Sequence, residues 1–255
     1  MQRYFISLSS LSTGEEVFLN EEITHHMFNV MRNHLDDRIY LITSDRFVYE
    51  GRLTGKKEGK ARVYIEKQID VPNTELNVEV TIACGLSKND KLDWIVQKAT
   101  ECGMSAFIPT ILKRDVVKWP PKKVPQRLER LQKIAQEAAQ QSYRLQIPSI
   151  KSPQTLKELT HQTDQYDHLI VAYEETAKKN EMNTLLKSHQ SLKNGDRILI
   201  VFGSEGGFDP QEILQLQDSG FVTVGLGPRI LRAETAPIYY LSTLSYVNDI
   251  MKLVL

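Results

Sequence analysis

The sequence predicts an α/β protein with two parts: a small β-rich domain, followed by a larger domain in which strands and helices alternate. Two observations predict this class. Short segments of alternating polarity, punctuated by Gly51, Gly55 and Gly59, fill the first part. Continuous apolar runs at 169–172 and 198–202 mark the second. Such runs are typical of strands that are buried on both faces of a parallel sheet, with helices covering each face.

In the first part we expect strands over 38–43, 47–53 and 61–66 and one helix over 22–32. This pattern indicates a small β-barrel-type domain. The turn-rich stretch 71–74 contains Pro72 and Asn73, and we place the domain boundary there, with the first domain at 1–72 and the second at 73–255.

In the second part the sequence pattern changes from successive strands to strands that alternate with helices. We expect strands over 78–83, 107–111, 169–172 and 198–202, with helical spacing from Leu92 to Ala99 and a long helix over 126–141. A final helix is expected over 234–255. It is apolar most of the way round, so either the core or a second subunit must cover it.

The composition argues against a membrane-spanning, a secreted or a metal-binding protein. The chain has 255 residues, 41% of them apolar, and no apolar run approaches the roughly 20 residues that span a bilayer. The first residues do not resemble a signal peptide, so we expect a cytoplasmic protein. Cys84 and Cys102 form no Cys-x-x-Cys pair, and the adjacent His25 and His26 chelate one metal poorly. We therefore expect no metal.

Formal net charge is zero, but basic residues gather between Lys113 and Lys133. Eight of them lie there, opposed only by Asp115 and Glu129. Because electrostatic attraction is screened beyond about 10 Å, a local excess can hold phosphates on a neutral protein. A solvated helix face is an equally good interpretation.

A glycine-rich turn, Gly203-Ser204-Glu205-Gly206-Gly207, follows the strand expected at 198–202. Asp209 and Glu212 can then form the capping box of a helix. Open α/β sheets bind ligands at this end of their strands, and glycine lets the backbone approach a flat ligand closely. Many such turns bind nothing, so the motif alone leaves binding open. Its spacing fits neither the dinucleotide fingerprint nor the P-loop.

A second loop, from Gly225 to Glu234, follows the next expected strand. It carries Arg229 and Arg232 among glycine, proline and apolar residues. Arginines in such a loop need an anion, which a phosphate or a carboxylate could supply. Glu234 lies in the first turn of the last helix, where the helix dipole favours a carboxylate, so it is either a structural cap or a functional group.

Together these loops resemble the signature of the ribosomal RNA small-subunit methyltransferase E family, in the SPOUT class. Similar motifs occupy 93–101, 114–118 and 137–144, and the resemblance covers nearly the whole chain. There are departures: Ser204 stands where the family usually has proline, and Tyr143 and Asp36 stand where it usually has glycine.

The resemblance implies a fold and a cofactor. Residues 1–72 should form a PUA-like RNA-binding β-barrel, and residues 73–255 a SPOUT α/β domain with a deep trefoil knot. S-adenosyl-L-methionine should bind in the knot, and the enzyme should be a homodimer. The cofactor-binding residues carried over are Ala172, Tyr173, Glu174, Phe202, Gly203, Glu205, Gly206, Leu226, Gly227, Ile230 and Leu231.

The implied reaction places a methyl group on N3 of one uridine in 16S ribosomal RNA, which we expect to be met in the assembled small subunit. Uracil N3 must lose a proton to react, and an arginine near O2 or O4 would stabilise the developing charge. The candidates for this role are Arg232 and Arg229, with Glu234 or Glu205 accepting the proton or orienting an arginine. The expected RNA contacts are Arg3, Arg32, Arg114, Lys118 and Arg144.

Two alternatives remain. One is a SPOUT-class methyltransferase that acts on transfer RNA, which the sequence of the arginine loop makes the weaker hypothesis. The other is a non-catalytic RNA-binding ribosome assembly factor. Such a protein should have lost the glycine loop or its charged neighbours, and both are present.

Overall fold

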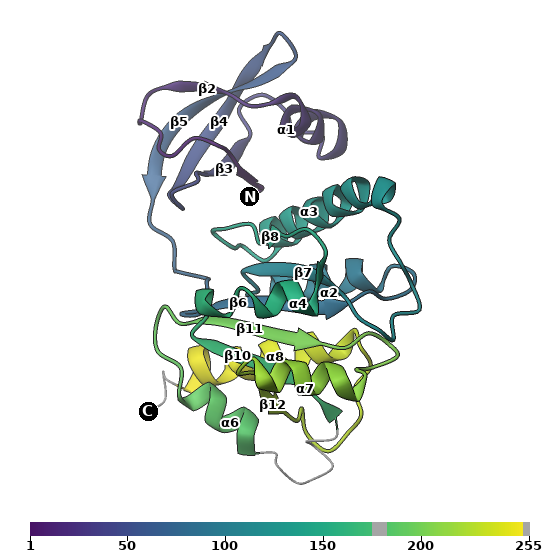
Figure 1. Ribbon diagram of the computed structural model, residues 1–255. Coiled ribbons are helices and arrows are strands. Elements are labelled where there is room, and N and C mark those ends of the chain that lie inside the picture. The colour runs from purple at the N-terminus through teal and green to yellow at the C-terminus, as the bar shows by residue number, and fades with distance from the viewer. Residues whose placement is uncertain (175–182, 252–255) are drawn as a thin grey trace. The chain divides into compact units, whose positions relative to one another are not determined.

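The computed structural model describes residues 1–174 and 183–251 and divides the chain into two compact units (Figure 1). The first unit is Met1–Glu75 together with Ala139–Gln146, and the second is Leu76–Ala138 together with Ile147–Leu255. The division after Glu75 lies close to the expected boundary. The segment Ala139–Gln146, which we expected in the second domain, belongs instead to the first unit.

The first unit is a five-stranded sheet with one short helix. Its strands follow the order β1 (Arg3–Phe5), β3 (Arg38–Ile42), β4 (Val48–Lys57), β5 (Lys60–Ile69) and β2 (Glu16–Phe18). The pairs β3–β4, β4–β5 and β5–β2 are antiparallel, and β1 lies parallel to β3. The helix α1 (Glu21–His25) continues into a π-helical turn (His26–Val30).

The core of this unit follows the alternation seen in the sequence. Ile39 and Leu41 of β3 and Val63 and Ile65 of β5 are fully buried, and Met27 closes the core from the helical side. The strands expected at 38–43, 47–53 and 61–66 are confirmed, with β4 and β5 longer than predicted. A closed PUA-like barrel stays a prediction.

The second unit is built on a parallel sheet, as the apolar runs predicted. Its order is β12 (Val222–Val224), β10 (His168–Ala172), β11 (Arg197–Phe202), β6 (Glu79–Gly85), β7 (Ala106–Ile111) and β8 (Ser149–Ile150), and β9 (Gln154–Thr155) also pairs with β7. Every pair is parallel. The predicted α/β class is therefore confirmed, and the knot stays a prediction.

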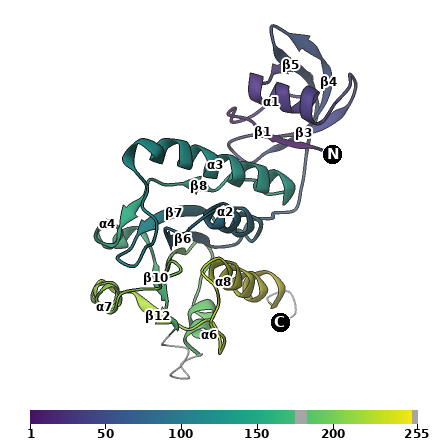
Figure 2. The ribbon, with the colours of Figure 1, turned by 90° about the vertical axis from the view of Figure 1, so that its right-hand side faces the viewer.

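Helices cover both faces of this sheet (Figure 2). They are α2 (Lys91–Glu101), α3 (Val124–Gln141), α4 (Leu156–Thr160), α6 (Asn183–Gln190), α7 (Pro210–Asp218) and α8 (Thr235–Ser245). Alternate residues of one strand enter opposite cores. Ile200 and Phe202 pack on the side of α2, α3, α6 and α8, whereas Leu199 and Val201 pack on the side of α4 and α7.

The final helix is shorter than expected. α8 ends at Ser245 and is followed by a π-helical turn, Tyr246–Ile250, while residues 252–255 lie outside the described part of the chain. In the part that is described, no helix is both long and apolar enough to cross a membrane.

Tyr143 closes α3 in a backbone conformation that favours glycine. Its φ is 61°, and the Arg144 N–H donates to the Ala139 carbonyl at 3.0 Å, the bond that closes a Schellman motif. The same motif ends α2 at Gly103 and α7 at Gly220, both with positive φ. The family's usual glycine at position 143 thus has a backbone reason.

We expect Tyr143→Gly to raise the free energy of unfolding by up to about 1 kcal/mol, because a side chain in the left-handed region costs about 1–2 kcal/mol. The gain is reduced by losing the contact of the Arg3 guanidinium, which lies 4.2 Å from the Tyr143 ring centroid. Chemical denaturation measures the difference. Tyr143→Ala, which keeps the strain and loses the contact, should be less stable than the unsubstituted protein.

His189, in α6, is a buried titratable group whose pKa burial lowers to about 4. Within the described residues its Nδ1 has no hydrogen-bond partner, and Nε2 lies 3.2 Å from the Thr243 hydroxyl. Since the unfolded chain binds this proton at higher pH, stability present above about pH 6.5 should be lost progressively down to about pH 4, by roughly 3 kcal/mol at most. Thermal melts of His189→Gln across this range should show a weaker loss; an unchanged pH dependence would contradict the assignment.

Candidate active site

The predicted ligand loops lie at one edge of the parallel sheet. β10 pairs with both β11 and β12, so the carboxyl ends of these three strands are neighbours. The segments after them, 172–174, 203–207 and 225–231, therefore follow adjacent strands. The family resemblance implied that the cofactor binds in these three loops, and the structure brings them to the same edge.

The glycine turn is held tightly by backbone packing. A Cβ on Gly206 would lie 2.5 Å from the Arg114 carbonyl oxygen, and a Cβ on Gly85 would lie 2.6 Å from the Ser204 nitrogen. Neither can become larger without moving backbone. The predicted capping box is confirmed at the start of α7: the Asp209 side chain accepts from the Gln211 and Glu212 N–H groups, and Glu212 Oε2 accepts from the Asp209 N–H at 2.8 Å. The turn is thus wedged between the loops after β6 and β7 and the first turn of α7.

We expect Gly206→Ala to displace this turn and to weaken cofactor binding by at least about tenfold, because the added methyl group collides with backbone rather than with a flexible side chain. Calorimetric titration with S-adenosyl-L-methionine measures the effect. Gly55→Ala is a matched control, since its Cβ would meet only the Arg62 side chain at 3.4 Å. Equal affinities for both variants would contradict the prediction.

Lys91 ties the two predicted loops together. Its Nζ lies 3.2 Å from Glu205 Oε1 and 3.2 Å from Glu234 Oε2, so one ammonium group pairs with a carboxylate from each loop. Burial is the largest single influence and would lower the pKa of Lys91, but the two carboxylates outweigh it and raise the pKa overall. The loop after β11 and the start of α8 therefore meet at one cation, in the first turn of α2.

Glu205 also accepts a hydrogen bond from the Lys88 N–H at 3.1 Å. Burial acts to raise the pKa of Glu205, but this bond and Lys91 outweigh it, and the net shift is downward. A lowered pKa makes this carboxylate a weak base at neutral pH. Glu234 is the N-cap of α8 but makes no capping hydrogen bond with its side chain. Its carboxylate faces Lys91 instead.

The Asp115 carboxylate binds backbone N–H groups of both the loop after β6 and the loop after β7. It accepts from the Leu112 N–H at 2.8 Å and from the Leu86 N–H at 3.3 Å. Burial raises its pKa, while these N–H groups and the Ser204 hydroxyl act to lower it. The carboxylate thus fixes both loops against the glycine turn.

The arginine loop presents its cations to solvent. Arg229 and Arg232 are exposed, and neither side chain has an ion-pair partner among residues 1–174 and 183–251. The Arg232 carbonyl accepts from the Thr235 and Ala236 N–H groups at 2.9 and 3.0 Å, which starts α8. The backbone of Arg232 is thus fixed at a helix end, and its guanidinium has no ion-pair partner in the described part of the chain.

The remaining predicted cofactor residues fall into two groups. Ala172, Tyr173, Gly203, Leu226, Gly227 and Leu231 are half-buried, and Glu174, Glu205, Gly206 and Ile230 are exposed. Phe202 is 2% exposed and packs edge-to-face on Tyr240 at 6.3 Å between centroids. Its side chain belongs to the core, so only its backbone can face a ligand.

Of the residues predicted to contact RNA, Arg32, Arg114 and Lys118 are exposed. Arg3 is half-buried and donates to the Tyr143 carbonyl at 3.1 Å. Arg144 is different, and the structure contradicts its predicted role. It is 2% exposed and is ion-paired with Glu75, so it stabilises the first unit from within and does not present its charge to an RNA phosphate.

Sequence reasoning did not identify Lys91 or the structural role of Asp115. Both act through partners distant in the sequence, Glu205 and Glu234 in one case and Leu86 in the other, and no local spacing indicates such contacts. Sequence reasoning also did not identify Trp119, which lines a cavity next to these loops.

The comparisons define the class to which this site belongs. A family model described as an RNA methyltransferase domain matches residues 74–245. Ribosomal RNA small subunit methyltransferase E of Bacillus subtilis is 41% identical over 261 residues, covering 99% of each chain. The chain therefore belongs to the RNA methyltransferases.

Structural comparison narrows the class further. A ribosomal RNA small subunit methyltransferase E from Neisseria gonorrhoeae, bound to S-adenosyl methionine, is 28% identical with a TM-score of 0.82, covering 97% of this chain and 98% of that one. A crystal structure described as a hypothetical protein is 39% identical with a TM-score of 0.88, covering 98% and 100%. Within the class, this chain belongs to the ribosomal RNA small subunit methyltransferase E family, as the sequence motifs predicted.

Proposed function

We propose that this protein uses S-adenosyl-L-methionine to methylate N3 of one uridine in 16S ribosomal RNA. The observation that carries the proposal is the convergence of the glycine turn and the arginine loop at Lys91, beside Arg229 and Arg232, which have no carboxylate partner within residues 1–174 and 183–251. The name and cofactor of the relative from Neisseria gonorrhoeae support the same assignment.

The residues present fit the cofactor. The turn at 203–207 offers backbone with no side chain at Gly203 and Gly206; an added Cβ would collide with the Arg114 carbonyl at Gly206 and would lie 3.1 Å from the Gly207 Cα at Gly203. Leu226 and Leu231 supply half-buried apolar surface from the neighbouring loop. Backbone N–H and C=O groups with apolar walls suit a flat purine and its ribose. We assign the cofactor-holding role to these loops and to 172–174.

The bound cofactor supplies an activated methyl group, and the protein must place and activate the base. Arg232, or Arg229, donates hydrogen bonds to the uracil oxygen on which negative charge develops when N3 loses its proton. Glu234 begins the helix that Arg232 leads into, and its side chain makes no capping hydrogen bond. We assign to Glu234 the role of accepting the proton or orienting Arg232. Arg114 and Lys118, both exposed, hold RNA phosphates.

Several finer features belong to the same proposal. The second unit would form the SPOUT trefoil knot, and the first unit the PUA-like RNA-binding barrel. The protein would act as a cytoplasmic homodimer on the assembled small subunit. Exposed Tyr246 and Ile250, 55% and 53% accessible after the end of α8, support a homodimer, since a second subunit would cover them.

Reverse transcription across small-subunit RNA tests the reaction. N3 methylation blocks base pairing. The reverse transcriptase should therefore stop at one uridine in RNA from cells that contain this protein, and it should read through that uridine in RNA from cells that lack the protein. A stop unchanged by the deletion would refute the assignment. A stop that appears only in transfer RNA would favour the related transfer-RNA enzyme. Purified protein that binds ribosomal RNA but not S-adenosyl-L-methionine would favour a non-catalytic assembly factor.

A further inference from the structure

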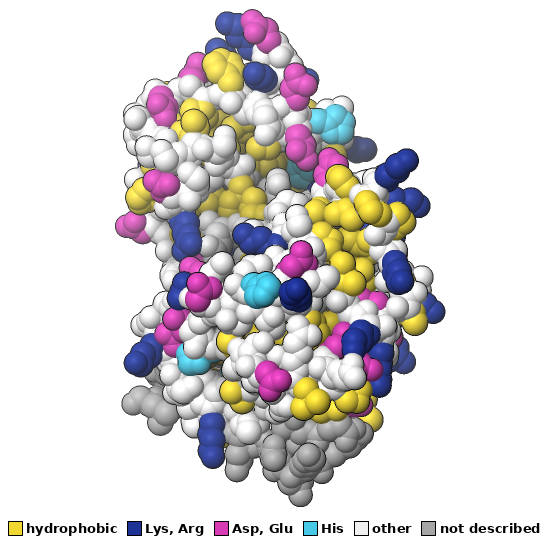
Figure 3. Space-filling model, in the orientation of Figure 1, with side chains coloured by type: hydrophobic (Ala, Val, Ile, Leu, Met, Phe, Trp, Pro, Cys, Tyr) yellow, Lys and Arg dark blue, Asp and Glu magenta, His cyan; other side chains and the backbone are white. Residues whose placement is uncertain are grey.

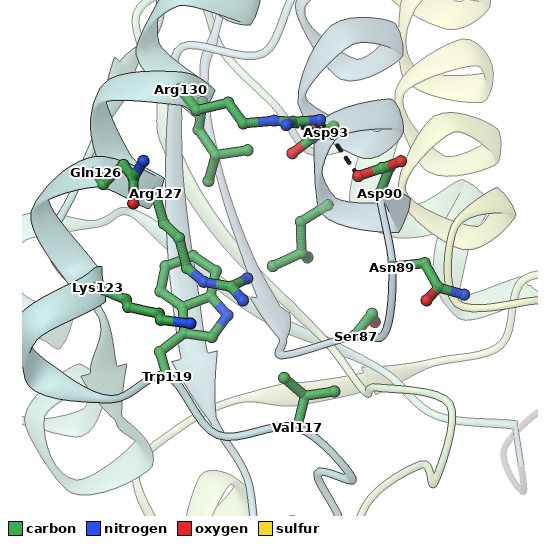
Figure 4. A pocket seen from close by; sticks show the side chains of 12 residues that line it. Ser87, Asn89, Asp90, Asp93, Val117, Trp119, Lys123, Gln126, Arg127 and Arg130 are labelled. Carbon is green, nitrogen blue, oxygen red and sulfur yellow. Dashed lines mark hydrogen bonds and ion pairs between the residues drawn. The ribbon is translucent and has the colours of Figure 1, made fainter.

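A cavity of about 480 Å³ lies in the second unit, outside the three loops assigned to the cofactor (Figure 4). One wall is the segment Ser87–Asp93, which follows β6, and the other is formed by Val117, Trp119 and the first turns of α3. The cavity is large enough for one nucleotide, since small-molecule sites are about 300–1,000 Å³. Its lining combines apolar, aromatic and charged side chains.

The cavity adjoins the candidate active site through a shared wall. The Lys88 N–H donates to Glu205, and Lys91 pairs with Glu205 and Glu234, so the segment that lines the cavity also holds the glycine turn and the arginine loop. A group bound in the cavity would lie beside the reaction site and not within the cofactor loops.

The cations around the cavity are not equivalent. Arg130 is neutralised, because its Nε donates to Asp93 at 2.7 Å and its Nη2 lies 3.2 Å from Asp90. Lys123 and Arg127 have no ion-pair partner in the part of the chain that the structure describes. Two carboxylates thus share one arginine, and the two other cations leave the cavity lining with a net positive charge that can attract an anion. On the face shown in Figure 3, basic and acidic side chains are likewise intermingled.

The Arg127 guanidinium and the Trp119 indole lie together in the lining of the cavity. The guanidinium carbon lies 5.0 Å from the indole centroid, and Figure 4 shows the guanidinium over the ring with Lys123 beside it. The Trp119 Nε1 is buried and has no hydrogen-bond partner among the residues that the structure describes. Proteins recognise unpaired nucleotides by stacking bases on aromatic rings and on arginine planes, with cations at the phosphate.

We infer that this cavity holds one unstacked nucleotide of the RNA substrate, with its base on the Trp119–Arg127 surface and its phosphate at Lys123. This rests on the proposed function, because it names the RNA as the occupant. Asn89, exposed on the opposite wall and shown there in Figure 4, supplies an amide for the edge of the base. Trp119 and Arg127 are positioning residues: they place the RNA and take no part in the transfer.

Kinetics on small ribosomal subunits from cells that lack this protein test the inference. Trp119→Leu removes the stacking surface and should raise KM for the subunit about 10-fold or more. Trp119→Phe keeps an aromatic face and should stay within about threefold of the unsubstituted enzyme. The Kd for S-adenosyl-L-methionine should not change in either variant. A KM for Trp119→Leu within about twofold of the unsubstituted value, or a rise that accompanies loss of the dimer, would overturn the inference.

A second variant covers the case in which Trp119→Leu does not fold, since Trp119 also packs against the core. Arg127→Met keeps the apolar stem and removes the plane and the charge, and it should raise KM in the same way; an unchanged KM would overturn the inference. The experiments distinguish failure of the proposed function from failure of the nucleotide site. Unsubstituted protein that methylates no ribosomal RNA refutes the proposed function, whereas active protein with insensitive Trp119 and Arg127 variants refutes only the nucleotide site.

Discussion

Arg232→Ala should lower kcat for methylation of the small subunit about 100- to 1,000-fold, the usual loss when one donor to a developing anion is removed. Affinity for S-adenosyl-L-methionine should stay the same. The physical reason is the placement of Arg232, which is fixed by the start of α8 through its carbonyl while its guanidinium has no carboxylate partner among the described residues. Single-turnover methylation, with cofactor affinity measured separately, tests both parts.

Two variants make the result specific. Arg232→Lys keeps the charge and loses the planar fork, so it should recover only part of the rate. Arg197→Ala is the matched control: Arg197 starts β11 at the opposite end of the strand and pairs with Asp167 at 3.1 Å, so its loss should leave kcat unchanged. Full activity of Arg232→Ala would refute its role. Full activity together with an inactive Arg229→Ala would transfer the role to Arg229.

The sheet of the second unit could be predicted because its longer strands are recognisable from their own residues. Runs such as 198–202 are apolar at every position, and the structure shows why: Leu199 and Val201 enter one core while Ile200 and Phe202 enter the other. The three-residue strands β1, β2 and β12 carry too few residues to show a period. They exist because their neighbours in the sheet offer hydrogen bonds.

In the candidate active site, too, features that depend on neighbouring residues could be predicted, and features that depend on distant contacts could not. The capping box of Asp209 and Glu212 is local and could be predicted. The proximity of the glycine turn to the arginine loop followed from the family resemblance, and the parallel order β12-β10-β11 gives its geometric cause. Lys91 could not be predicted, because its two carboxylates lie more than a hundred residues away in the sequence and approach only after the sheet has formed.

The position of Arg144 also depends on a residue distant in the sequence, but here the local sequence led to a wrong prediction. It lies in a polar motif shared with the family, where an exposed arginine for RNA is the natural expectation. The left-handed turn at Tyr143 instead directs the chain so that Arg144 meets Glu75, 69 residues away. Burial of a charge is decided by such a partner, and the residues next to Arg144 do not reveal it.

Glu75→Ala should therefore lower the free energy of unfolding by about 3–5 kcal/mol, the usual cost of leaving a buried charge without its counterion. Glu75 accepts from Arg144 Nε at 3.0 Å, from the Leu145 N–H at 2.7 Å and from Gln146 Nε2 at 3.1 Å. Arg62→Met is the control, because it breaks an exposed pair with Glu16 at 3.6 Å in the same unit. That loss should stay below about 1 kcal/mol. Denaturant titration compares them, and similar losses would show that burial adds nothing.

The double variant Glu75→Leu with Arg144→Met separates the ion pair from the rest of the network. If the pair were all that Glu75 contributes, replacing both charges by apolar groups should restore most of the stability, since buried ion pairs often compare poorly with apolar packing. The Leu145 N–H would still lose its acceptor, at a cost of about 1–3 kcal/mol. We therefore expect recovery to remain incomplete by about that amount. Full recovery would mean that the Leu145 N–H finds another acceptor, and no recovery would mean that Glu75 stabilises the turn mainly through its backbone contact and not through Arg144.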